Sequence, residues 1–344
     1  MALLWVLLLP SILFAADSRQ PCTIADAACV EKVMLGSKGR FSLVYRSYPL
    51  AEPNPAVERA LIVIHGAGRN ADSYFLSGVA GAVIANALSN TLIVSPRLAS
   101  NSGGACKDKL AEGEISWTCS GEQDWRGGGR AHDAKELHSF DLVDEILKKL
   151  NRREAFPNLR VIVITGHSAG GQFVNRYAAA NRVEKSLRVP VKYVVSNPST
   201  YLYLDPTRLP GEATCSAKGG CTAEFREYWD RRNCTTYNRW RNGLEAKTGY
   251  AEKVPDEELR RNLSTRDVTY LLGELDTLPL FGFDGTCPAM AQGPNRLARG
   301  VTYWNYLQSK YKAKHQLTLV PNCGHNGRCM FTADEALPVL FPKL

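Results

Sequence analysis

Short apolar runs recur along the chain and alternate with longer amphipathic stretches. Each run is rich in β-branched residues and stops at Gly or Pro, as strands buried on both faces do. The runs predict strands at 60–66, 91–96, 160–166, 191–198, 268–274 and 316–321. The stretches between them predict helices at about 72–89, 132–150, 169–182 and 295–311. This alternation favours a parallel sheet with helices on both faces, an α/β fold.

Three segments depart from the alternation. Residues 40–50 alternate polar and apolar side chains, which predicts an antiparallel edge strand. Residues 97–130 are rich in Gly and Ser and predict a loop. Residues 198–266 lie between two predicted core strands and carry aromatic residues and cysteines, so we expect an inserted cap. Its arginines alternate with acids, which favours a solvated helical face over an anion site.

The beginning of the chain predicts export. Residues 2–16 are uncharged and almost wholly apolar and end in small residues, which is typical of a signal peptide, here cleaved near Ala16. No Lys or Arg precedes this run, so an uncleaved anchor is the alternative. We expect residues 1–16 to be removed and 17–344 to form one secreted or periplasmic domain without a membrane span.

Ten cysteines fit an oxidising compartment. Eight of them form close pairs along the chain: Cys22 with Cys29, Cys106 with Cys119, Cys215 with Cys221, and Cys323 with Cys329. Cys234 and Cys287 then remain for a long-range bridge. Zinc is the competing interpretation, and the absence of any C-x-x-C pair speaks against it.

The formal charge of +8 is spread along the chain, and no nucleic-acid recognition motif accompanies it. Nucleic acid is therefore not an expected partner. The sequence G-G-G-R at 127–130 follows no predicted strand, so it is not a dinucleotide-binding motif.

The pentapeptide G-H-S-A-G at 166–170 lies where a predicted strand meets a predicted helix. In such a turn a Cβ at either glycine would collide with the neighbouring strand and helix. The turn raises the hydroxyl of Ser168 above the sheet, beside free N–H groups of the helix. We therefore expect Ser168 to be a nucleophile, with a purely structural glycine-rich turn as the alternative.

A serine hydroxyl needs a base that removes its proton and a third group that orients the base. His325, in the loop C-G-H-N after strand 316–321, is the expected base. The other histidines are placed elsewhere by the pattern: His138 inside a helix, His315 at a basic helix end, His132 before a helix, His65 in another motif, and His167 pointing away from the serine.

Asp276, just past the end of strand 268–274, is the expected acid. Glu274, Asp284 and Asp205 are the alternatives.

An oxyanion formed at the serine requires preorganised donors. The backbone N–H of Ala169, directly after the nucleophile, is one candidate. The flexible G-A-G turn after strand 60–66 offers Ala67, or Gly68 in second place. We expect His65 to fix this turn by hydrogen bonding.

The order strand–HGAG, strand–GHSAGG, strand–LDT and strand–CGHN resembles the α/β-hydrolase superfamily over roughly residues 40–340. The resemblance implies an eight-stranded, mainly parallel sheet with a cap at 198–266. It also implies acyl transfer to water through a covalent ester on Ser168, without a metal or organic cofactor. Dehalogenases and epoxide hydrolases carry an aspartate at the nucleophile position, so Ser168 speaks against both.

The expected activity is hydrolysis of small or medium acyl or aryl esters by an exported, carboxylesterase-like serine hydrolase. A peptidase or amidase with the same triad, and a binding protein that has lost catalysis, are the alternatives. Candidate pocket residues are Trp125, Gln172 and Tyr201, with Asn175 and Tyr203 also possible and ordinary core packing as the alternative for each. The oligomeric state is not determined by the sequence.

Overall fold

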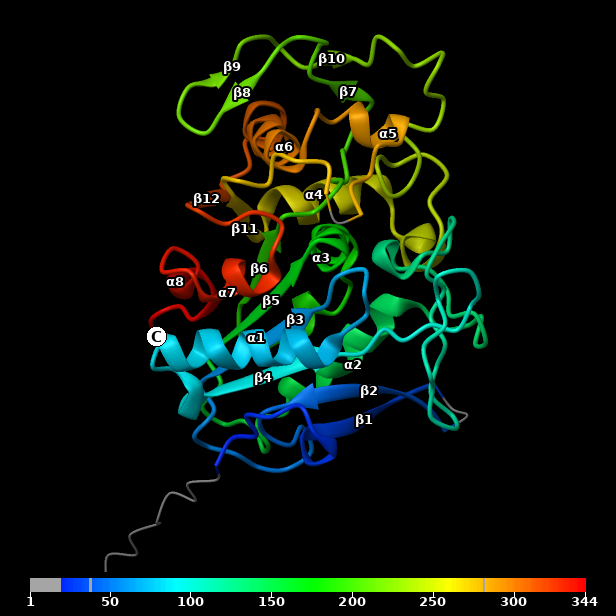
Figure 1. Cartoon of the computed structure of the whole chain (residues 1–344). Coiled ribbons are helices and arrows are strands. Elements are labelled where there is room, and N and C mark those ends of the chain that lie inside the picture. The colour runs from blue at the N-terminus through cyan, green and yellow to red at the C-terminus, as the bar shows by residue number, and fades with distance from the viewer. Residues whose placement is uncertain (1–19, 37–38, 281) are drawn as a thin grey trace, which may run out of the picture.

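A computed structural model describes residues 20–36, 39–280 and 282–344, so the predicted signal peptide (1–16) lies outside the described residues. An eight-stranded sheet runs through the molecule in the order β1-β2-β4-β3-β5-β6-β11-β12 (Figure 1). Its strands are β1 Val30–Leu35, β2 Arg40–Arg46, β3 Arg59–Ile64, β4 Thr91–Pro96, β5 Val161–His167, β6 Val191–Ser196, β11 Asp267–Gly273 and β12 Gln316–Val320. β2 is antiparallel to both β1 and β4, and all other neighbours are parallel. The predicted α/β-hydrolase fold with a mainly parallel eight-stranded sheet is confirmed.

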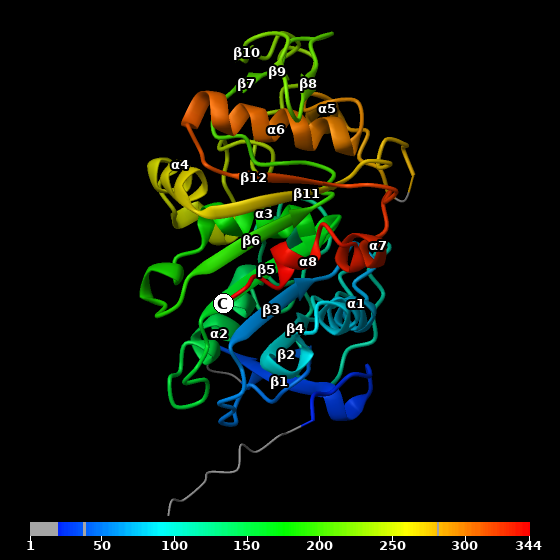
Figure 2. The ribbon, with the colours of Figure 1, turned by 90° about the vertical axis from the view of Figure 1, so that its left-hand side faces the viewer.

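Helices cover both faces of this sheet (Figure 2). The α-helices are α1 Ala71–Ile84, α2 Ser139–Leu150, α3 Ala169–Ala180, α4 Asp256–Thr265, α5 Cys287–Met290, α6 Arg296–Tyr311, α7 Gly327–Thr332 and α8 Leu337–Leu340. Short 3₁₀ helices are η1 Ala27–Cys29, η2 Leu88–Asn90, η3 Trp125–Gly127, η4 Glu184–Ser186 and η5 Gly249–Lys253. The helices α1, α7 and α8 pack on one face, and α2, α3, α4 and α6 pack on the other.

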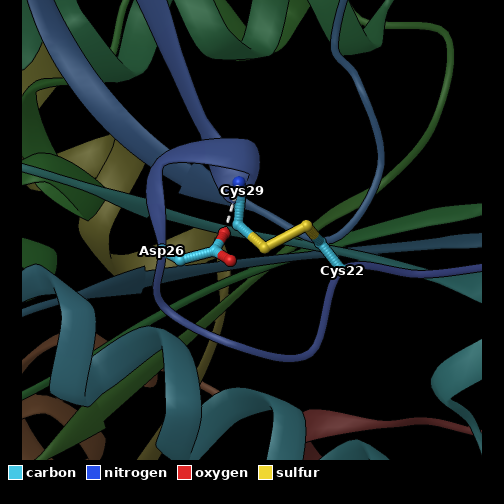
Figure 3. Close-up of side chains that lie close together, drawn as sticks. All are labelled: Cys22, Asp26 and Cys29. Atoms are coloured by element: carbon cyan, nitrogen blue, oxygen red, sulfur yellow. Dashed lines mark hydrogen bonds between the residues drawn. A yellow bond between two sulfur atoms is a disulfide. The ribbon is translucent and has the colours of Figure 1, made fainter.

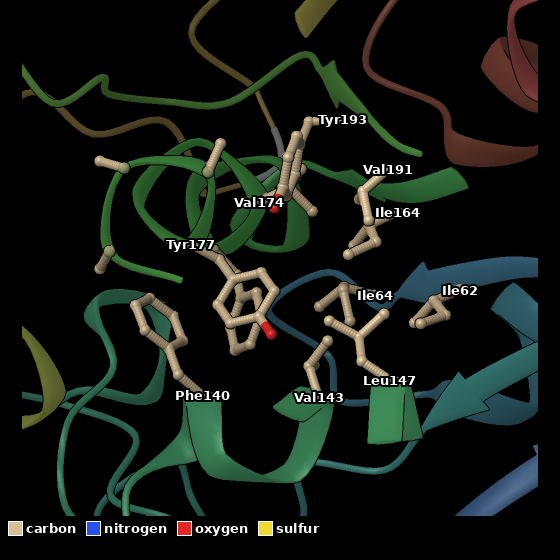
Figure 4. Close-up of a cluster of buried hydrophobic side chains, with 14 of the residues drawn as sticks. Ile62, Ile64, Phe140, Val143, Leu147, Ile164, Val174, Tyr177, Val191 and Tyr193 are labelled. Carbon is tan, nitrogen blue, oxygen red and sulfur yellow. The ribbon is translucent and has the colours of Figure 1, made fainter. Parts of the chain in front are cut away.

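The core explains why the strands are apolar at consecutive positions. Because strand side chains alternate between faces, Ile62 and Ile64 of β3 point towards α2 and α3, while Leu61 and Val63 point towards α1. Figure 4 shows the first group packed against side chains of α2 and α3. Both faces are buried, so β3 and the neighbouring parallel strands need apolar residues throughout.

The structure departs from the prediction in several elements. The strand β1 was not predicted, and it pairs along its whole length with β2. The predicted edge strand at 40–50 is therefore an interior strand, β2, which pairs with both β1 and β4 and ends at Arg46. The helix predicted from residue 132 begins at Ser139, because the backbone N–H of His138 donates to the carboxylate of Asp141 and closes a capping box there. The other predicted core strands agree with the structure to within one or two residues.

The predicted insertion, residues 198–266, connects β6 to β11. It forms two small antiparallel sheets, from β7 Thr207–Arg208 with β10 Arg226–Glu227 and from β8 Cys215–Ser216 with β9 Gly220–Cys221. Figure 1 shows both small sheets beyond α6, and β8 contacts that helix. The segment ends in α4, which packs against α3.

All five predicted cysteine pairings are present as disulfides. Figure 3 shows Cys22 and Cys29 bonded to each other beside Asp26, whose carboxylate accepts the backbone N–H of Cys29. These three side chains are close enough to hold a metal ion. Because each sulfur is bonded to the other, neither is a thiolate ligand, and the cluster is a structural crosslink. Five disulfides are typical of a protein from an oxidising compartment.

None of the helices in the described ranges is both long and apolar enough to cross a bilayer.

Candidate active site

The turn from β5 into α3 presents Ser168 at the carboxyl edge of the sheet. The serine has φ 60° and ψ −118°, a strained conformation for a residue with a side chain. A Cβ on Gly166 would lie 2.5 Å from the backbone of Gly170, and one on Gly170 would lie 2.2 Å from the carbonyl oxygen of Ile64. Since backbone atoms cannot move aside as a side chain can, both positions require glycine.

Ser168, His325 and Asp276 form a hydrogen-bonded chain. Nε2 of His325 lies 2.9 Å from Oγ of Ser168, and Nδ1 lies 2.8 Å from Oδ2 of Asp276. The serine follows β5, the aspartate follows β11, and the histidine follows β12, so the ends of three strands at one edge of the sheet supply the chain. The geometry brings together the three residues that the sequence predicted.

Asp276 is held in place by a residue that sequence reasoning missed. Its side chain is only 2% exposed, and Nη1 of Arg296 on α6 lies 3.3 Å from its second carboxylate oxygen, Oδ1. Nε of Arg296 also donates to Oγ of Ser199. Burial lowers the pKa of Arg296, and the carboxylate of Asp276 opposes this shift. The pair fixes the orientation of the carboxylate that contacts His325.

None of the alternative acids contacts His325 in the described structure. The carboxylate of Asp205 accepts from Thr207 and Tyr311, and that of Asp284 accepts from Thr286. Glu274 is exposed at the end of β11.

A cavity of about 540 Å³ opens beside the serine. Ala67 and Gly68 line it together with Ser168 and His325. Ala169 begins α3, where the first N–H groups of a helix have no intrahelical partner. Ala67 and Gly68 therefore share a cavity with the serine, and Ala169 directly follows the serine in the chain.

His65 fixes the turn that carries Ala67. It is fully buried, with Nδ1 2.9 Å from the carbonyl oxygen of Gly66 and Nε2 accepting the backbone N–H of Leu98 at 3.0 Å. Burial lowers the pKa of His65 to about 4. A neutral ring can make both contacts at once, donating at Nδ1 and accepting at Nε2.

The buried, neutral His65 predicts a pH dependence of stability. The pKa of His65 is 6.5 in the unfolded chain and about 4 in the folded protein. The contribution of the neutral ring to the free energy of unfolding is therefore fully present above pH 6.5 and is lost as the pH falls towards 4. The loss amounts to about 2 kcal/mol at pH 5. The free energy of unfolding, measured with urea at pH 7 and at pH 5, should differ less between the two pH values in His65→Gln than in wild type. Exposed His132→Gln should keep the wild-type difference, and equal differences in wild type and His65→Gln would contradict the assignment.

Strand alternation predicted that His167 points away from the serine, and this prediction is wrong. The ring centroid of His167 is 4.6 Å from that of His325, and it lines the same cavity as Ser168. Nδ1 lies 3.0 Å from the hydroxyl of Tyr74 on α1. Burial, and next the charge of His325, hold the pKa of His167 well below its usual value. A neutral imidazole therefore packs against the candidate base.

Asn197, directly after β6, is a second positioning residue that sequence reasoning missed. Its side chain accepts the backbone N–H of Gly273 at 2.8 Å and donates to the carbonyl oxygen of Gly324 at 3.1 Å. These contacts join the loop of the candidate acid to the loop of the candidate base. The only local signal was Asn-Pro at a strand end, which predicts a turn and no long-range contact.

The predicted pocket residues lie deeper than expected. Trp125 is buried with its ring 5.1 Å from His65, and Tyr201 is buried and stacked on Tyr303 at 4.6 Å. This packing favours the alternative of core residues for both. Gln172 is buried one turn after Ser168 and accepts the hydroxyl of Thr200.

Two other histidines differ from their predicted places. His138 precedes the first residue of α2 and is not inside a helix. His315 lies between α6 and β12 and is buried, with Nδ1 3.2 Å from the hydroxyl of Tyr270. Neither contacts Ser168.

A family comparison agrees with this fold. The profile of the Alpha/beta hydrolase family matches residues 61–337, which is more than half of the sequence. The chain therefore belongs to the α/β-hydrolase family. A search of curated proteins finds no match.

Two solved structures share the fold at low sequence identity. LpqC, a poly(3-hydroxybutyrate) depolymerase from Bordetella parapertussis, superposes with a TM-score of 0.57 at 20% identity, covering 88% of this chain and 84% of that one. Poly(aspartic acid) hydrolase-1 from Sphingomonas sp. KT-1 gives 0.55 at 22% identity, covering 88% and 95%. Similarity at this level establishes the architecture, whereas the chemistry must be argued from the residues of the site.

Proposed function

We propose that this chain is an exported serine hydrolase that cleaves carboxylic esters through an acyl-enzyme on Ser168. The observation that carries the proposal is the hydrogen-bonded chain Ser168–His325–Asp276 at the edge of an α/β-hydrolase sheet. The apolar segment 2–16 and the five disulfides support export.

The chemistry follows from the roles of these groups. Nε2 of His325 takes the proton of Ser168 as Oγ attacks the ester carbonyl, and Asp276 stabilises the resulting imidazolium. The N–H groups of Ala169 and Ala67, with Gly68 as the alternative to Ala67, stabilise the oxyanion. His325 then protonates the departing alcohol. Water, deprotonated by His325, attacks the acyl-enzyme and releases the acid.

Labelling by a fluorophosphonate tests for the activated serine. Wild-type protein is expected to be labelled at Ser168, as located by peptide mass spectrometry, because this reagent reacts with serine nucleophiles that a base has activated. Heat-denatured protein is the control. Folded protein that takes up no label would favour the alternative of a binding protein without catalysis.

A comparison of two substrates separates esterase from amidase. A p-nitrophenyl ester and the p-nitroanilide of the same acyl group pass through the same acyl-enzyme. We expect turnover of the ester to exceed that of the anilide. The opposite order would favour the peptidase or amidase.

Residues 198–266 are proposed as the cap that selects among esters.

A further inference from the structure

Three arginines converge on a second, small cavity on the α3 side of Ser168. The cavity measures about 40 Å³, and its lining is polar. It is lined by Arg126, Gln172, Arg176, Thr200, Arg241, Asn242 and Asp284. We call it the arginine pocket. Arg126 comes from η3, Arg176 from α3, and Arg241 from the predicted cap, so the pocket joins three separate parts of the chain.

The acids near the arginine pocket do not balance its charge. Asp124 is fully buried and pairs with two guanidinium groups. Nε of Arg126 donates to its carboxylate at 2.8 Å, and Nη1 of Arg241 lies 3.5 Å from the same carboxylate. Asp284 lines the pocket. Its Oδ1 also accepts from the backbone N–H and the hydroxyl of Thr286. Three guanidiniums therefore face two carboxylates, and one positive charge remains.

Arg176 carries that imbalance most directly. It is fully buried, and no described carboxylate forms an ion pair with it. It donates only to neutral oxygens: the carbonyl of Arg241 at 2.9 Å, the hydroxyl of Thr200 at 2.8 Å and the amide of Gln172 at 3.4 Å. Burial, with the charges of Arg241 and Arg126, holds the pKa of Arg176 well below its usual value. A buried cation without a counter-ion is unfavourable, so the site favours an anion.

The arginine pocket lies close to the reaction centre. The backbone N–H of Gln172 donates to the carbonyl oxygen of Ser168, so Gln172 stands one helical turn beyond the nucleophile and Arg176 stands two turns beyond it. These turns correspond to roughly 6 and 12 Å along α3. The larger cavity, by contrast, is lined by His325 and residues of α1 and α7.

This arrangement assigns the two halves of an ester to different sides. His325 must protonate the departing oxygen, so the alcohol half belongs in the cavity that His325 lines. The acyl half then lies outside that cavity, and Gln172, one helical turn beyond Ser168, is the residue on α3 that lines the arginine pocket nearest to the nucleophile along the chain.

We propose that the arginine pocket binds a carboxylate at the far end of the acyl chain, so that the preferred substrates are half-esters of dicarboxylic acids. This inference rests on the proposed function and narrows its substrate class. Guanidinium groups match a carboxylate in shape and charge, because their paired N–H groups can donate to both oxygens. The cavity has about the volume of one small group, since a water molecule accounts for about 30 Å³ in the liquid.

The test compares charged and neutral esters with the same leaving group. Mono-p-nitrophenyl esters of glutaric, adipic and suberic acid are each paired with the diester in which a methyl group caps the free carboxylate. For at least one chain length we expect kcat/KM of wild-type enzyme to be about tenfold or more higher for the half-ester, which is the range of a charge-assisted hydrogen bond. The uncatalysed rate is subtracted for each ester.

Variants assign the preference to the arginine pocket. Arg241→Gln and Arg126→Gln are each expected to reduce the ratio of the two kcat/KM values about tenfold, whereas Arg241→Lys should retain part of it. Arg239→Gln is the matched control, because Arg239 lies two residues away on the same loop, outside the pocket, with its side chain 48% exposed. It should keep the wild-type ratio.

The outcomes separate this inference from the proposed function. Hydrolysis of the neutral esters without preference for any half-ester would overturn the inference and leave the esterase in place. A preference that both glutamine variants retain in full would also overturn it, because the anion would then bind elsewhere. If neither kind of ester is turned over, the proposed function fails, and the substrate class falls with it.

Discussion

Ser168→Ala is expected to lower kcat/KM for a p-nitrophenyl ester by about 10⁶-fold, because no acyl-enzyme can then form. The fold should persist, since the serine hydroxyl contacts only His325 among the described residues. Initial rates and a melting curve measure the two effects. Activity that survives would come from residual stabilisation by the oxyanion donors.

Ser309→Ala provides the matched control for this result. Ser309 is exposed on α6, and its hydroxyl donates only to a backbone carbonyl. The control should keep wild-type activity. A Ser168→Ala variant within tenfold of wild type would show that another residue is the nucleophile.

Asp276→Asn is expected to lower kcat/KM by about 10⁴-fold while His325 stays near Ser168. The amide NH₂ facing Nδ1 would favour the wrong tautomer of His325, and the imidazolium would lose its negative partner. Steady-state rates from pH 6 to 9 measure the effect, and fluorophosphonate labelling should slow in parallel.

Glu274→Gln is the control for this carboxylate. Glu274 is two residues away and exposed, so the variant should behave as wild type. If Glu274→Gln were the impaired variant and Asp276→Asn the active one, the assignment of the acid would be wrong.

The parts of the fold that follow from local patterns could be predicted from the sequence. The strand β4 has the predicted bounds because both of its faces are buried and its apolar run ends at Pro96. The glycines of the Ser168 turn mark a place where backbone approaches backbone, which the sequence reveals. The two short disulfide loops at Cys215 and Cys323 were predicted from the close spacing of their cysteines, and both are present.

The residues that sequence reasoning missed act across long separations. Arg296 reaches Asp276 from α6, 20 residues further along the chain, and Asn197 joins two loops that are 76 and 127 residues away. Hydrophobic periodicity carries no information about such polar pairs. His167 was misplaced because alternation within a strand no longer holds where β5 turns sharply into Ser168.

The disulfide between Cys323 and Cys329 spans the loop that carries His325. Neither cysteine belongs to a strand of the large sheet, whose strands are joined by backbone pairing. We therefore expect protein produced in a reducing cytosol to form the sheet while the loop that carries His325 is held less rigidly. In protein made without this disulfide, the amount of folded protein and the number of active sites that react are separate quantities. Burst titration measures the second.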